Sequence, residues 1–208
     1  MARDKTQPSS TATRGEPLRQ RVIDAAERLL REGKADFSMR DLAAEAGVSF
    51  ATPFNQFGSK AAIMHALAER RIDTMAKRFA EQPPLPYAAD RVLLAIGIAA
   101  AGMLEEPIVN RSVMGWIGTA GPVPGKALAH STALWQLALG DGEGLIASGQ
   151  EEALHSLARQ LAFAFRGVLS FWTSGELADD ALASSARQAA STLLLGFTER
   201  RSSGGHNS

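Results

Sequence analysis

The sequence predicts an all-α protein of about nine helices, arranged as a small N-terminal unit and a larger helical body. Apolar residues recur at the 3.6-residue period of a helix along most of the chain, and no stretch shows strand-type alternation bounded by turns. The clearest boundary is 81–87, where three prolines cannot continue a helix. Apolar residues make up 45% of the 208 residues, which is enough for a substantial core.

The expected elements follow from caps and breaks between the periodic segments. Residues 1–16 lack a period, so we expect a disordered leader; its Arg3, Lys5 and Arg14 could enter a minor groove, although a solvated leader is favoured. A first domain over 17–65 should continue in a connecting helix to about residue 80, followed by a body over 84–200 and a disordered tail at 201–208. The expected helices span 17–32, 39–46, 49–56, 59–80, 88–105, 107–119, 126–142, 150–174 and 179–200.

Charge and composition narrow the class of protein. The chain has 22 basic and 22 acidic residues, and residues 1–60 carry a net charge of only +2, from ten Lys/Arg and eight Asp/Glu. This positive charge is small for a protein that binds nucleic acid, unless two copies act together. The absence of cysteine excludes disulfides and thiolate metal sites. The leader is polar and the apolar, uncharged run 92–104 is too short to span a bilayer, so we expect a soluble cytoplasmic protein.

Residues 38–60 have the pattern of two short helices joined by a tight turn. Ser38 suits an N-cap with Asp41 as its capping-box partner, and Gly47 suits the left-handed residue that ends a helix. Ser49 is expected to cap the second helix, and Lys60 begins the next one, where a phosphate could meet its ammonium group. The spacing indicates a helix-turn-helix, whose second helix lies in a major groove.

This segment resembles the TetR family of bacterial transcriptional regulators over residues 18–65. The positions that carry the resemblance are Ala46-Gly47-Val48-Ser49, Ala51-Thr52, Phe54, Phe57 and Ser59-Lys60. The resemblance implies a homodimer on a palindromic operator and an effector cavity among the middle helices. Three positions depart from the family pattern: Ala51 replaces a glycine, Pro53 an aliphatic residue, and Phe54 a tyrosine whose hydroxyl commonly reaches a phosphate. With Ser49 as N-cap, Pro53 would be the fourth helical residue and would forfeit about one hydrogen bond.

The second helix is expected to contact DNA, with Phe54 and Phe57 assigned to the core. Thr52 and Asn55 can hydrogen-bond to base edges, and apolar side chains can meet a thymine methyl. The residues expected on base edges are Phe50, Ala51, Thr52, Pro53 and Asn55; Ser38, Arg40, Gln56 and Lys60 are expected on phosphates, and Ser49 beside them.

The body is rich in large apolar side chains, which favours a core and also suits a ligand cavity with few polar groups. The expected ligand-binding residues are Met103, Asn110, Met114, Trp116, His130, Trp135, Phe163 and Phe171. Because 86–149 offers only three cations, Arg91, Arg111 and Lys126, we expect a small, mostly apolar, uncharged effector.

The last two helices predict a dimer interface, as two from each chain could form a four-helix bundle. The apolar stripe comprises Leu154, Ala158, Leu161, Phe165, Val168, Trp172, Leu182, Ala186, Ala189, Leu193 and Phe197.

The favoured function is a homodimeric repressor released by an effector. One alternative is a regulator without ligand, whose body only dimerises or binds a protein partner; the other is an enzyme with an incidental three-helix head. The enzyme is poorly supported, because Glu152 and His155 lack the second motif copy of a di-iron site and 140–144 lacks the strand of a phosphate loop. We expect no cofactor, metal or catalytic residue.

Overall fold

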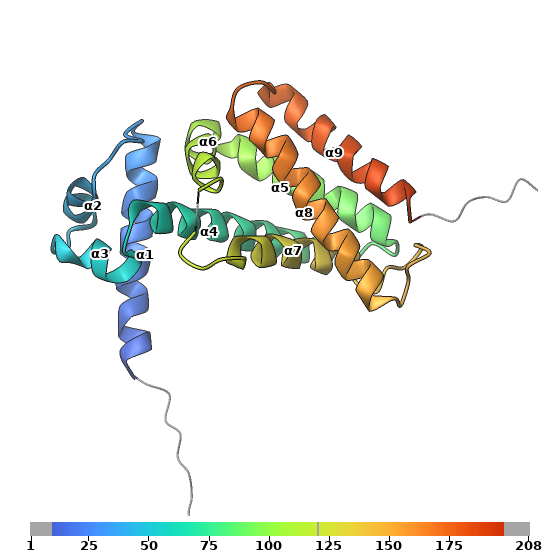
Figure 1. Ribbon diagram of the computed structural model, residues 1–208, viewed down its shortest axis with the longest axis horizontal. Helices are drawn as coiled ribbons and strands as arrows, with labels where there is room; N and C mark the ends of the chain where they lie inside the picture. Colours follow the sequence, from blue (N-terminus) through green and yellow to red (C-terminus); the bar gives the residue numbers. More distant parts are fainter. Residues whose placement is uncertain (1–9, 120, 198–208) are drawn as a thin grey trace, which may run out of the picture.

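The computed structural model describes residues 10–119 and 121–197, and within them it contains nine α-helices and no strand (Figure 1). The all-α prediction is confirmed. The helices are α1 (Ser10–Arg31), α2 (Met39–Ala46), α3 (Ala51–Phe57), α4 (Lys60–Ala80), α5 (Ala88–Glu105), α6 (Pro107–Trp116), α7 (Lys126–Leu139), α8 (Glu151–Thr173) and α9 (Asp179–Leu195).

The helices α1–α3 form a head around the apolar face of α1. Val22 and Ala26 are fully buried on that face, and Leu42 of α2 and Ile63 of α4 close the core from the other side. The figure shows this head at one end of the molecule, with α4 running from it beneath the body (Figure 1). A helix of 21 residues therefore contributes to both cores and joins them.

The first helix begins at Ser10 rather than at residue 17, which corrects the expected leader for residues 10–16. Pro17 suggested a helix start because a proline in the first turn has no hydrogen bond to lose. Here Pro17 lies inside the helix, where the missing N–H affects one bond, while Ala12, Arg14 and Glu16 around it are good helix formers. The rest of the leader and the tail lie outside the described residues, as do Arg3 and Lys5.

The body consists of α5, α6, α7, α8 and α9, packed on the second half of α4. Helix α5 contacts α9 and α7, and α8 contacts α7 and α9, so α8 and α9 lie side by side along one edge (Figure 1). Trp135 and Trp172, both 0% exposed, are the largest side chains in its core. No single described helix is long and apolar enough to cross a membrane; α5 and α6 pass that test only as a pair, and they are bent by 107°.

The dimer interface predicted on α8 and α9 is wrong for most of its residues, because these side chains face the core of the protomer itself. The buried members, each at most 9% exposed, are Leu154, Ala158, Leu161, Phe165, Trp172, Leu182 and Ala186. Val168, Ala189, Leu193 and Phe197 are half-buried. A regular apolar stripe shows that a helix packs, but it does not say whether the neighbour belongs to the same chain.

Candidate functional site

The turn between α2 and α3 is built by local hydrogen bonds and one left-handed glycine. The Ser38 Oγ accepts from the Asp41 amide at 3.2 Å, and Asp41 Oδ2 accepts from the Ser38 amide at 2.8 Å, which completes the expected capping box. The Ser38 amide and the Ser38 hydroxyl both donate to the Asp41 carboxylate, and these two bonds lower the pKa of Asp41. Gly47 has φ 61°, and the Arg21 guanidinium, from α1, donates to the carbonyls of Ala46 and Gly47 at 2.9 and 3.1 Å. The turn is therefore fixed against α1.

Helix α3 begins at Ala51, and Ser49 does not cap it. Phe50 occupies the cap position without a side-chain hydrogen bond, while the Ser49 hydroxyl lies 2.8 Å from the Thr52 hydroxyl. Pro53 is consequently the third helical residue and not the fourth. In the first turn the missing proline N–H would have had no intrahelical partner, so the expected loss of a hydrogen bond does not occur.

An aromatic pair stands on the exposed surface of α3. Phe50 and Phe54 are 54% and 43% exposed, and their rings meet edge to face with centroids 5.5 Å apart. The assignment of Phe54 to the core is therefore wrong, whereas Phe57 is half-buried with the Arg19 guanidinium 4.2 Å above its ring. Pro53 is buried, which rules out the expected contact of its ring with a thymine methyl.

The other residues expected on DNA differ in how exposed they are. Ala51 and Asn55 are exposed, and Thr52 and Gln56 are half-buried on the same short helix. Ser38 is exposed at the start of α2, and Ser49 is exposed in the turn before α3.

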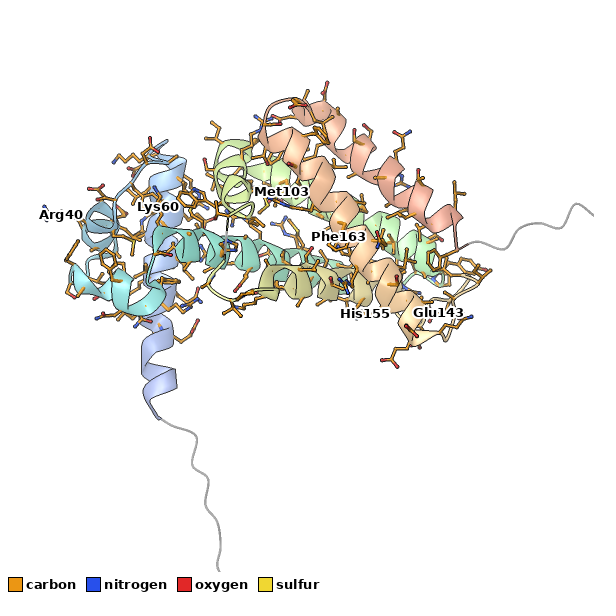
Figure 2. The ribbon with its side chains drawn as sticks, in the orientation of Figure 1. Arg40, Lys60, Met103, Glu143, His155 and Phe163 are labelled. Atoms are coloured by element: carbon orange, nitrogen blue, oxygen red, sulfur yellow. The ribbon has the colours of Figure 1, made fainter. Side chains whose placement is uncertain are left out.

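Two cations expected on phosphates have different surroundings. Lys60 donates to the carbonyls of Ala35 and Phe37 at 2.7 and 2.9 Å, and its Nζ lies 4.2 Å from the centre of the Phe37 ring. Burial lowers the pKa of Lys60. Arg40 is exposed, forms no ion pair among the described residues and lies 5.7 Å from the Phe50 ring. Figure 2 shows Arg40 projecting from the outer edge of the head, with Lys60 inside it. Lys60 therefore supports the head, and Arg40 is the better phosphate ligand.

A cavity of about 280 Å³ lies in the body, enclosed by α4, α5, α6, α7 and α8. Four of the expected ligand residues line it: Met103, Met114, Trp135 and Phe163. Phe163 is 47% exposed and so lies at its edge. The remaining wall is mostly apolar, with Ile72, Met75, Leu128, Leu134, Phe165 and Leu169 among its residues.

The other four expected ligand residues do not line this cavity. Asn110 is 1% exposed and donates to the carbonyls of Gly102 and Met103, so its role is structural. His130 Nε2 lies 2.9 Å from Asp73 without the geometry of a hydrogen bond. Trp116 packs at the edge of the core near Lys60, and Phe171 is 58% exposed on α8.

Sequence reasoning missed three polar residues of the cavity, because it counted the cations only within residues 86–149. His65 and Arg71 belong to α4, and Arg166 belongs to α8. The signal available in the sequence was that two long helices with both polar and apolar residues, α4 and α8, precede and follow α5–α7 in the chain. The periodicity could not show which of their residues turn toward the same space.

A cluster of charges joins the head to the wall of this cavity. Glu27 of α1 is 7% exposed and pairs with Arg70 and Arg71 of α4. Arg71 also donates to Asn110 of α6 at 3.0 Å and lies 3.5 Å from Glu106. Since a buried carboxylate is stable only when it is paired, the cluster couples the position of α1 to that of α4 and α6.

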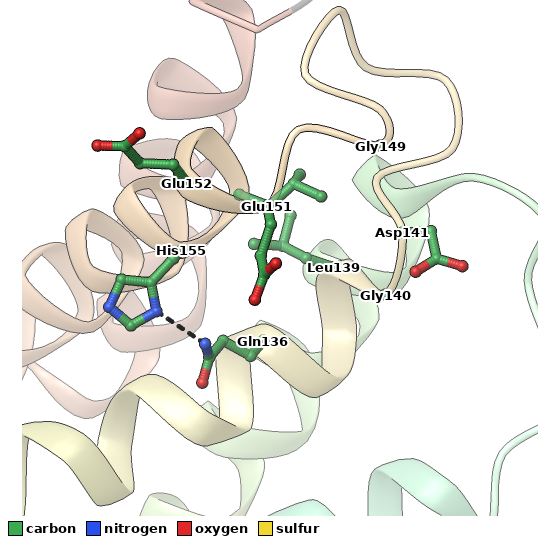
Figure 3. Close-up of a pocket in the computed structure, with 9 residues that line it drawn as sticks. Gln136, Leu139, Gly140, Asp141, Gly149, Glu151, Glu152 and His155 are labelled. Atoms are coloured by element: carbon green, nitrogen blue, oxygen red, sulfur yellow. Dashed lines mark hydrogen bonds between the residues drawn. The ribbon is translucent and has the colours of Figure 1, made fainter.

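A second, open depression of about 760 Å³ lies where α7 meets α8 (Figure 3). Gln136 and His155 meet across it at 2.8 Å, and Asp141, Glu151 and Glu152 lie around it. No group of carboxylate and histidine side chains suited to a metal occurs among the described residues. Glu152 and His155 are both exposed on α8. The adjoining loop is held against α5, because the Ala88 amide donates to the Glu143 carbonyl at 2.9 Å and Arg91 pairs with the Glu143 carboxylate.

An exposed recognition helix on a three-helix head, joined by a long helix to a helical body, defines a helix-turn-helix DNA-binding regulator. The family model for bacterial regulatory proteins of the tetR family matches residues 22–67. A TetR transcriptional regulator from Rhodococcus sp. RHA1 is similar in structure, with a TM-score of 0.72 and 26% identity over 86% of this chain and 97% of that chain. A TetR-like regulator from the same organism has a TM-score of 0.50 and 18% identity, over 86% of this chain and 96% of that one, which shows the fold alone. No curated protein matches the sequence.

Residues 22–67 form a TetR-family N-terminal domain, and the chain as a whole is similar in structure to a TetR regulator. It is a DNA-binding transcriptional regulator, which confirms the resemblance drawn from residues 18–65.

Proposed function

We propose that this regulator binds a palindromic operator as a homodimer, through α3 of each protomer, and leaves it when a small molecule occupies the body cavity. The observation that carries the DNA-binding mode is the exposed face of α3, where Phe50, Ala51, Phe54 and Asn55 stand clear of the protein. An exposed apolar pair beside a polar amide suits a major groove, where thymine methyls lie next to base-edge donors and acceptors.

The electrostatic part of this binding should be modest. Several basic residues of the head are already engaged within the protein: Arg19, Arg21, Arg28, Arg31, Lys34 and Lys60. Phosphate contacts give affinity and salt dependence without sequence information, so a head with few free cations relies more on its base contacts. We expect a shallow salt dependence, with Arg40 as a principal phosphate ligand.

A homodimer is supported by the outer face of α8, and not by the stripe that the sequence suggested. Phe163, Gly167 and Phe171 are spaced four residues apart and so fall on one side of the helix. Phe163 and Phe171 are 47% and 58% exposed, and a Cβ added at Gly167 would meet nothing within 4 Å. A dimer formed through this face has to present its two heads to half-sites about 34–36 Å apart.

Release by a ligand is supported by Arg71, which touches both the cavity and the charge cluster. It lines the cavity and pairs with Glu27 of α1, so a ligand that shifts α4 or α6 must also rearrange the contacts of the head. A ligand that binds the rearranged state more tightly increases its population, and in that state the two heads no longer have the spacing of the operator half-sites. The likeness is to regulators, which favours this function over an enzyme.

The proposal is tested by selecting bound sequences from genomic fragments and then measuring binding to the selected duplexes. A palindromic site, protected over two half-sites and bound by a dimer in sedimentation, is the expected result. Sites without two-fold symmetry, bound by one chain, would refute the homodimer. A ligand-independent body, the alternative, predicts that no cavity-binding compound changes affinity for the operator.

A further inference from the structure

The body cavity contains donors without acceptors, and their arrangement identifies the charge of its occupant. Apart from Arg166, the polar residues of its wall are His65, Glu69, Arg71 and Ser131. Glu69 is the one carboxylate among the lining residues, and its Oε2 already accepts from Lys126 Nζ at 2.9 Å. Arg71 is paired with Glu27. Three other side chains of the wall carry N–H groups or ring nitrogens without an acidic partner: Arg166, Trp135 and His65.

Arg166 is a half-buried cation with no ion pair among the described residues. Its one hydrogen bond goes from Nη1 to the carbonyl of Met114, in the last turn of α6, at 3.2 Å. The other inward-lying arginines differ: Arg70, Arg71 and Arg91 each pair with a carboxylate. Burial without a counter-ion lowers the pKa of Arg166. A guanidinium has five donors, so most of its capacity for hydrogen bonds is unused here.

Trp135 adds a second, independent observation. It is 0% exposed, and its indole Nε1 is buried without a partner in the described part of the chain. The other tryptophan of the core, Trp172, donates from Nε1 to Asp179 at 2.7 Å. His65, 5% exposed, likewise has a buried Nε2 without a partner among those residues. Buried donors are normally paired, because a buried donor without an acceptor destabilises the protein.

We propose that the cavity binds a small apolar monocarboxylic acid, whose carboxylate pairs with Arg166 while a ligand oxygen accepts from Trp135 Nε1. This inference rests on the proposed ligand-responsive function and differs from the uncharged effector expected from the sequence. The skeleton is apolar because the rest of the wall consists mainly of Met, Leu, Ile and Phe side chains. The cavity volume of about 280 Å³ is at the lower limit for ligand sites, which suits a single ring or a short chain.

The acid class follows from the number and kind of donors. A cation in the cavity would face Arg166 with no acidic side chain free to receive it, since Glu69 is occupied by Lys126. A neutral ligand could accept from Trp135 but would leave the guanidinium uncompensated. A carboxylate has two oxygens and accepts bidentate bonds from arginine, so it compensates the charge of Arg166 and offers acceptors to the donors of the cavity.

The test compares probes that share an apolar skeleton and differ in their polar end group: phenylacetate, 2-phenylacetamide and phenethylamine, together with hexanoate, octanoate and their amides. Calorimetry on the full chain should show that acids bind at least about tenfold more tightly than their amides, as a charged hydrogen bond implies. Binding should weaken as the pH falls through the pKa of the acid itself. Tighter binding of amides or amines, or no binding of any acid in the millimolar range, would overturn the proposal.

Variants locate the site. Arg166→Gln should weaken the acids by about ten- to a hundredfold and leave the amides unchanged, whereas Arg187→Gln, an exposed change on α9, should alter neither. Trp135→Phe keeps an aromatic ring and should weaken the acids about two- to tenfold. Arg166→Lys retains the charge and serves if the glutamine variant does not fold. Equal losses for acids and amides in Arg166→Gln, or no loss, would contradict the assigned anchor.

Operator release is measured separately, by fluorescence anisotropy of the protein–DNA complex. Acids that bind through Arg166 but do not change DNA affinity would confirm the ligand class and refute its role as effector. Amides that release DNA while acids do not would keep the proposed function and refute this inference.

Discussion

Lys60 provides the sharpest test of how the head is built. A lysine at the start of α4 could hold a phosphate or hold the protein together, and the two roles predict different results for Lys60→Met. The bond to the Phe37 carbonyl is partly buried, and a hydrogen bond to a charged donor contributes about 1.5–3 kcal/mol. The more exposed bond to Ala35 adds little, and the contact with the Phe37 ring contributes about 0.5–1 kcal/mol.

The replacement should therefore destabilise the protein by about 2–3 kcal/mol, since part of this sum is recovered by water. For a chain of this size the melting temperature should fall by about 4–12 °C. The slope of log K against log salt for operator binding should not change. Differential scanning calorimetry gives the first quantity, and anisotropy titrations at several salt concentrations give the second.

Arg40→Met is the matched control, because Arg40 is exposed and has no ion pair among the described residues. Stability should change by no more than about 0.5 kcal/mol. The salt slope should fall by about 0.9 for each phosphate that is no longer neutralised, or roughly 2 for a dimer. If Lys60→Met leaves the melting temperature unchanged and lowers the slope instead, the structural role of Lys60 is refuted.

Asn55→Ala should change the preferred base at one position in each half-site, with a penalty of about 1–3 kcal/mol for the original site, and repeated selection of bound sequences measures this. Unchanged preferences would remove Asn55 from the recognition surface. Phe171→Glu should yield monomers in sedimentation at micromolar concentration, whereas Leu137→Glu, at a similarly exposed site on α7, should not; a dimer in both would refute the assigned face. The Arg31 guanidinium lowers the pKa of Glu106. The stabilisation from their bond is therefore fully present when the pH is above the ordinary pKa of a glutamate, and it is lost as the pH falls through the lowered pKa of Glu106. Acid unfolding should thus be less steep in Glu106→Gln, and identical profiles would refute the linkage.

The fold was predictable because its signals are local. Gly47, the prolines of 81–87 and the helical periods identify every described helix, and the residues around Gly47 also identify the family. The start of α3 was harder to predict: Ser49 is a good N-cap residue, but its hydroxyl is engaged with Thr52, and the helix begins beyond it. The shift of its start moved Pro53 into the first turn.

The candidate sites were predicted less well, because they depend on which neighbour covers a helix face. The stripe on α8 and α9 was correctly recognised as apolar, but the protomer covers it itself. The proposed dimer face instead contains Phe163 and Phe171, which the sequence assigned to the ligand. In the cavity, the decisive cation is Arg166, distant in sequence from Met114, whose carbonyl it contacts. Such a pairing is a property of the packed helices and cannot be deduced from the period of either.

Pro53 has a consequence for the energetics of recognition. An isolated helix of seven residues is marginal in water, because few hydrogen bonds offset the entropy of ordering it. Proline restricts φ in the unfolded chain as well, so the ordering of α3 removes fewer conformations than it would with another residue. The reading surface is then set before DNA arrives, and it adjusts little on contact. If α3 does not change its shape on binding, the DNA duplex must deform to fit it. We therefore expect the flexibility of the base steps in the operator to contribute to sequence preference.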